Sequence, residues 1–145
     1  ETMDDRTLEA RANGEDWNVA QIVGYLRDAE REDQVSIMAI ARIDGARIRD
    51  RRAIHGPEDR EYDALDVTEL LWEFLTLREE TEWLLQNAGG AWRHVGTHPY
   101  RGEIELQQFV MEMNERDLDC MWRIQRLRDA HRPPGAPRVT GAADV

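Results

Sequence analysis

The sequence is short of the residues and runs that would place it in several common classes of protein. With one cysteine it can form no internal disulfide, as is typical of a protein in a reducing cytosol. It has no apolar run close to the roughly 20 residues of a membrane span, and no signal peptide is recognisable. Its one serine, Ser36, falls within a predicted helix, and neither a phosphate-binding glycine loop nor a Cys-x-x-Cys pair is present. We therefore expect a cytoplasmic protein without these familiar catalytic motifs.

What the chain has in excess is negative charge. Its 30 acidic residues outnumber its 19 basic residues, which gives a net charge of −11 over 145 residues. An acidic surface repels phosphate groups, so we expect neither nucleic acid nor a membrane as a partner. The length is that of one domain with a buried core.

Apolar residues recur at helical spacing in three segments, and each is predicted to be a long helix. The segments run from Asn18 to about Ile43, from Asp66 to Gly89, and over Glu103–Leu127. Asn18 and Gln21 have the spacing of a capping box, in which two side chains bond the exposed backbone N–H groups of a helix start. The glycine pair after the second segment is a strong helix stop.

A weaker helical pattern covers Asp4–Ala12, and no segment shows the alternation of a β-strand. We therefore predict an all-α fold, a four-helix bundle over residues 1–130. A loose tail rich in proline, glycine and alanine is expected at 131–145. The long linker 44–65 would be unusual without structure of its own, so a short helix near Glu58–Ala64 is expected there.

One position on the apolar stripe of the last helix carries a charge. Arg116 falls in line with Phe109, Met113, Cys120 and Leu127. A charge on a core-facing stripe costs stability unless it is paired. We expect its partner to be a carboxylate on the helix that follows Asn18, with Asp28 first and Glu32 next. The alternative is that Arg116 holds an anionic ligand.

The segments Trp17–Glu30, Gly96–Glu103 and Arg116–Ile124 together resemble the DinB/YfiT-like family of helical-bundle proteins. The first is similar to a family helix in which a tryptophan and a capping residue precede a His-Leu-x-Asp pattern. The second resembles the loop before the last helix, and the third resembles a His-Asp-x-x-His-Leu-x-Gln-Ile pattern. The resemblance implies a four-helix bundle.

Members of that family commonly bind a divalent metal through three histidines, one on the second helix and two at i and i+4 on the last. The matching positions in this chain carry Tyr25, Arg116 and Cys120. Arginine has no lone pair to offer a metal, so we expect no metal and no cofactor. The thiol chemistry that the resemblance implies would need altered ligands here.

We expect a metal-free small-molecule-binding protein, or a repurposed enzyme, that uses a pocket lined by Tyr25, Asp28, Arg116, Cys120 and His98. Two alternatives stay open. One is a structural or interaction module that acts as a homodimer, and the other is a metal-dependent enzyme, similar to thiol transferases, with altered ligands. An enclosed cavity at these side chains would favour the pocket, whereas tight packing would favour the interaction module.

Two further expectations concern particular side chains. Trp72, Trp83 and Trp122 are candidates for a homodimer interface, because aromatic residues are enriched at interfaces. Cys120 is expected to be either a small buried apolar residue or a nucleophile whose pKa is depressed by Arg116, one turn earlier.

Overall fold

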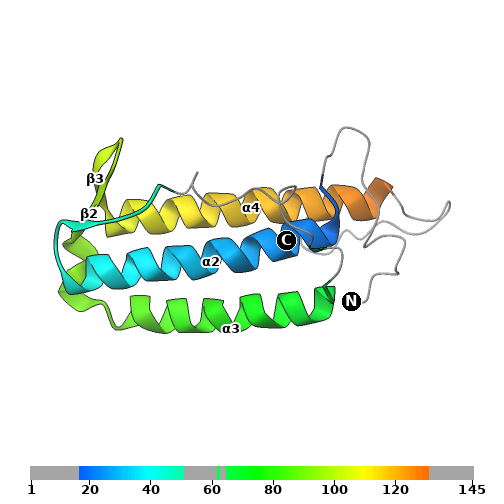
Figure 1. The fold of residues 1–145 in the computed structure, drawn as a ribbon, viewed down its shortest axis with the longest axis horizontal. Coiled ribbons are helices and arrows are strands. Elements are labelled where there is room, and N and C mark those ends of the chain that lie inside the picture. The colour runs from blue at the N-terminus through cyan, green and yellow to red at the C-terminus, as the bar shows by residue number, and fades with distance from the viewer. Residues whose placement is uncertain (1–16, 51–61, 63–64, 131–145) are drawn as a thin grey trace, which may run out of the picture.

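The computed structural model describes residues 17–50, 62 and 65–130, which form three long helices and a small β-sheet (Figure 1). In chain order the elements are α2 (Val19–Arg42), β1 (Ala46–Arg47), α3 (Val67–Gln86), the 3-10 helix η4 (Gly89–Arg93), β2 (Val95–His98), β3 (Gly102–Glu105) and α4 (Leu106–Ala130).

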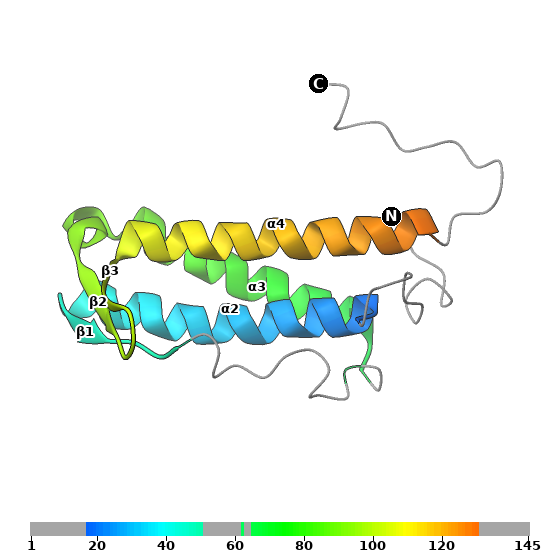
Figure 2. The same ribbon diagram turned by 90° about the horizontal axis from the view of Figure 1, so that it is seen from above.

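Helices α2 and α3 run in the same direction and α4 runs in the opposite one, with the sheet at one end of the three helices (Figures 1 and 2). Helix α2 packs against both α3 and α4. One hydrophobic cluster joins the three helices, and it contains Val19, Ile22, Val23, Leu26, Leu70, Cys120 and Leu127. A second cluster lies toward the sheet and contains Ile37, Ile40, Ile48, Ile104, Leu106, Phe109 and Met113.

The helix starts follow local sequence signals. The predicted capping box at α2 is confirmed, since the Asn18 side chain accepts from the Gln21 N–H at 2.8 Å and the Gln21 side chain accepts from the Asn18 N–H at 2.9 Å. Asp66 caps α3 by accepting from the N–H of Thr68 at 2.9 Å. Helix α4 begins later than predicted, because Gly102–Glu105 forms a strand.

The predicted all-α four-helix bundle is wrong, because the described residues contain a three-stranded mixed sheet and three long helices. Strand β1 pairs with β2 in parallel, and β2 pairs with β3 antiparallel, with Val95 opposite Glu105 and His98 opposite Gly102. The strands are two to four residues long. These lengths lie at or below the four-residue minimum over which an alternating pattern can be recognised.

The predicted helices at Asp4–Ala12 and near Glu58–Ala64, and the predicted tail at 131–145, lie largely or wholly outside the described residues. Among the described helices, none has the length and apolar content that a membrane crossing requires.

Candidate functional site

Arg116 is the centre of a buried ion-pair cluster that joins all three long helices. Its side chain is 12% exposed and reaches from α4 into the bundle. Nη1 donates to Asp33 at 2.5 Å, and Nη2 donates to Asp117 at 3.2 Å and to Glu30 at 3.3 Å. The charge that interrupts the apolar stripe of α4 is therefore paired, as burial requires.

A second arginine completes this cluster from α3. Arg78 binds Glu30 with two hydrogen bonds, from Nε at 3.1 Å and from Nη2 at 2.8 Å. The same Nη2 donates to Asp117 at 2.6 Å. Two guanidinium groups and the carboxylates of Glu30, Asp33 and Asp117 give the cluster a net charge of −1. We call these five residues the ion-pair cluster.

The arginines keep the cluster ionised. Burial alone would raise the pKa of Glu30, but hydrogen bonds from Arg78 and Thr81 outweigh it and lower that pKa below the ordinary value. Burial would lower the pKa of Arg116, yet the charges of Asp33, Asp117 and Glu30 raise it above the ordinary arginine value. Within the described part of the chain, the buried Nε of Arg116 has no hydrogen-bond partner.

The predicted partners of Arg116 were the wrong carboxylates. Asp28 instead accepts a hydrogen bond from the buried phenol of Tyr62 and forms an ion pair with Arg27 at 3.1 Å. Glu32 pairs with exposed Arg49 at 3.3 Å. The reason is helical phase, because Glu30 and Asp33 continue the core-facing stripe of α2 whereas Asp28 and Glu32 project from other sides of the helix.

The other predicted pocket residues lie in apolar or structural surroundings. Tyr25 is partly buried with its ring centroid 5.9 Å from that of Trp17, against the cluster that contains Cys120. Cys120 is 1% exposed. Burial raises its pKa to about 11 despite the nearby positive charge of Arg116, so the thiol is protonated at neutral pH. The thiol has the properties of a small buried apolar residue rather than those of a nucleophile.

His98 lies in β2, at the sheet end of the molecule (Figure 1). Its Nδ1 accepts from the backbone N–H groups of Tyr100 at 3.1 Å and Arg101 at 3.0 Å, and its Nε2 lies 3.3 Å from a carboxylate oxygen of Asp50. These contacts order the hairpin turn between β2 and β3. His98 is therefore not grouped with Tyr25 and Cys120 in one pocket.

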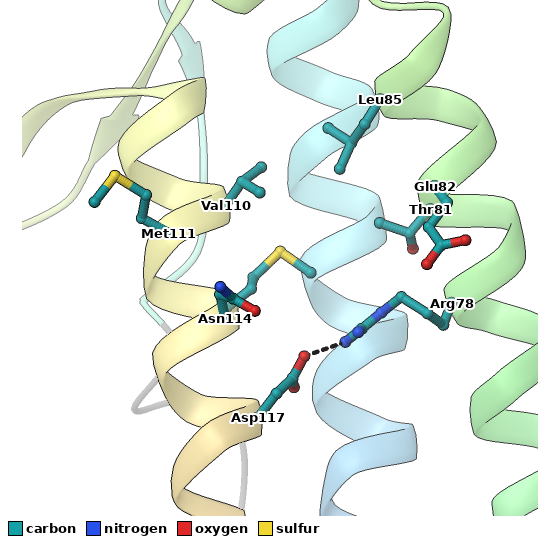
Figure 3. Close-up of a pocket in the computed structure, with 9 residues that line it drawn as sticks. Arg78, Thr81, Glu82, Leu85, Val110, Met111, Asn114 and Asp117 are labelled. Carbon is teal, nitrogen blue, oxygen red and sulfur yellow. Dashed lines mark hydrogen bonds and ion pairs between the residues drawn. The ribbon is translucent and has the colours of Figure 1, made fainter. Parts of the chain in front are cut away.

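A groove of about 330 Å³ lies between α3 and α4, and two members of the ion-pair cluster, Arg78 and Asp117, line it (Figure 3). Its lining residues are Arg78, Thr81, Glu82, Leu85, Val110, Met111, Met113, Asn114 and Asp117. Figure 3 shows Arg78 extending from α3 toward Asp117 on α4, which closes one end of the groove with an ion pair. The other end is apolar. We call this feature the α3–α4 groove.

The groove was not predicted, and neither were four members of the ion-pair cluster. One signal could have found Glu30 and Asp33, because they share the helical spacing of Leu26, Ile37 and Ile40 and so interrupt an apolar stripe as Arg116 does. No comparable signal predicts the groove, because its width depends on how far apart α3 and α4 lie.

Among the described residues, no group of three His, Cys, Asp or Glu side chains is arranged to hold a metal ion. Comparisons with protein-family models, with curated proteins and with solved structures found no match to this chain.

Proposed function

We propose that this chain is a metal-free binding protein for a small, largely apolar molecule without negative charge, and that the α3–α4 groove is the binding site. The observation that carries the proposal is the groove itself. Its volume of about 330 Å³ falls at the lower end of the range of small-molecule sites. Such sites are mostly apolar with a few fixed polar groups, and this groove has that composition.

The side chains that line the groove indicate which kind of ligand it can bind. Leu85, Val110, Met111 and Met113 offer an apolar wall, and methionine adapts readily to different shapes. The exposed amide of Asn114 forms no hydrogen bond within the described part of the chain, so it can bond a polar group of a ligand.

Charge argues against an anionic ligand. Arg78, Glu82 and Asp117 give the lining a net charge of −1, and the guanidinium of Arg78 is already bound to two carboxylates. An acid entering the groove would meet two carboxylates and no uncommitted positive group. A neutral or cationic molecule meets no such penalty.

We propose in addition that the resemblance to DinB/YfiT-like proteins reflects descent from a metal-binding ancestor. In this chain Arg116 and Arg78 supply positive charge among the carboxylates and hold the three helices together. Two members of the ion-pair cluster, Arg78 and Asp117, thus close one end of the groove, and no catalytic step is assigned to the cluster.

The test uses N-phenylnaphthylamine, an uncharged amphiphile whose fluorescence rises in apolar surroundings. We expect saturable binding of one molecule per chain to the wild-type protein. Asn114→Trp, which fills the groove from its wall, should abolish that binding. Glu115→Trp is the matched control, because the neighbouring exposed position does not line the groove. Equal loss in both variants, or binding that survives Asn114→Trp, would contradict the proposal.

A further inference from the structure

The α3–α4 groove continues toward the other end of the helices as exposed apolar surface. On α3, Leu71 and Leu75 lie seven residues before Arg78 and Glu82, which line the groove. Seven residues are two helical turns, so Leu71 and Leu75 lie on the same side of α3 as the groove.

The same relation holds on α4. Leu118 and Met121 follow the groove residues Met111 and Asn114 by seven positions. All four residues of this continuation are exposed, from 43% for Leu71 to 63% for Met121. Trp72 and Trp122 adjoin them and are also exposed. We call these six residues the apolar extension; exposed apolar residues that gather on one side of two helices are typical of an interaction site.

Charge divides the two sides of the apolar extension. From its cap to Leu77, α3 has no basic residue and three acidic ones, Asp66, Glu69 and Glu73, of which Glu73 binds Arg27 of α2 at 2.9 Å. The last eight residues of α4 hold three arginines and one aspartate, and one of the arginines, Arg123, binds Asp119 of the same helix at 3.0 Å. Because α3 begins where α4 ends, the acidic and basic segments lie at the same end of the molecule (Figure 1).

We propose that the apolar extension is the contact between two copies of this chain. A twofold axis along the helices places α3 of one copy against α4 of the other, twice over, as an isologous interface requires. Leu71 and Leu75 then meet the partner's Leu118 and Met121. The acidic start of α3 meets the basic end of the partner's α4.

A second copy is the occupant that the charges favour, because both complementary halves are present on this one chain, at the same end of the molecule. Without such complementary segments, two copies that each have a net charge of −11 would repel one another. The apposition of α3 with α4, rather than of α3 with α3, places opposite charges together. The proposal does not depend on ligand binding in the groove.

Sedimentation at micromolar concentration is expected to show a dimer. Met121→Glu should weaken dimerisation at least ~10-fold, since it places a charge at the centre of the contact. Leu75→Glu, on the other helix, should have a similar effect. Val35→Glu is the control, because Val35 is a comparably exposed apolar residue on α2, away from the extension. Circular dichroism checks that each variant is folded.

A charge exchange tests the orientation. Glu69→Arg and Arg126→Glu should each weaken dimerisation, and the double variant should recover most of the wild-type affinity. A protein that sediments only as a monomer would overturn the proposal. So would a dimer that survives Met121→Glu and Leu75→Glu, or that Val35→Glu disrupts equally.

Discussion

Removal of the Arg116 guanidinium is the perturbation to which the fold should respond most strongly. Asp33 is 1% exposed and accepts from Arg116 at 2.5 Å, while Glu30 and Asp117 retain Arg78. Arg116→Leu takes the net charge of the cluster from −1 to −2 inside the bundle. Loss of one partner of a buried ion pair typically costs about 3–5 kcal/mol. We therefore expect a fall in melting temperature of roughly 10–15 °C.

The cause can be separated from simple loss of packing. Asp33→Asn in the Arg116→Leu background returns the cluster charge to −1, so it should recover at least half of the lost free energy of unfolding. Arg49→Leu is the control, because Arg49 and Glu32 form an exposed pair whose loss should cost less than about 1 kcal/mol. The assay is urea unfolding followed by circular dichroism. An Arg116→Leu protein as stable as wild type, or a double variant less stable than the single one, would refute the reasoning.

Three further predictions concern other parts of the structure. Gly24→Ala should destabilise the protein by about 1–3 kcal/mol in thermal melts, because a Cβ at this position would overlap the ring of buried Tyr62. Gly90→Ala is the control and should be tolerated, because open space surrounds that position. Burial raises the pKa of Cys120 from its ordinary value of 9.0 to about 11 in the folded protein. The free energy of unfolding should therefore fall as pH rises from about 9 to about 11, and this fall should be absent in Cys120→Ala. Anilinonaphthalenesulfonate has the rings of N-phenylnaphthylamine and an added negative charge, so fluorescence titrations should show that it binds the groove more weakly than the neutral probe. Asp117→Asn removes one carboxylate from the lining and should reduce the difference in affinity between the two probes.

The starts of α2 and α3 could be predicted because their causes are local. The reciprocal bonds of Asn18 and Gln21 need four consecutive residues and nothing else. The sheet could not be predicted in the same way. Strand β2 is held by partners 50 residues earlier, at Ala46, and by β3 across a turn that His98 orders. These strands exist because of pairing, and four residues carry too little pattern to show it.

The candidate site was predicted in part. A charge on an apolar stripe indicated that Arg116 is buried and paired, and the structure confirms the pairing. The predicted partners, Asp28 and Glu32, were wrong, because the helical phase of α2 presents Glu30 and Asp33 to Arg116 instead. Arg78 could not be found from the sequence of α4, since it comes from a third helix.

The central claim is that a small, largely apolar molecule without negative charge binds between α3 and α4, and chemical-shift mapping by NMR tests it most directly. Titration of the uniformly ¹⁵N-labelled protein with N-phenylnaphthylamine should shift the backbone amides of residues 78–85 and 110–117 in a saturable manner. The chemical shifts of the amides near Tyr25 and in the β2–β3 hairpin should not change. Shifts centred on Tyr25 and Cys120, or weak shifts spread over all exposed apolar residues without saturation, would contradict the account.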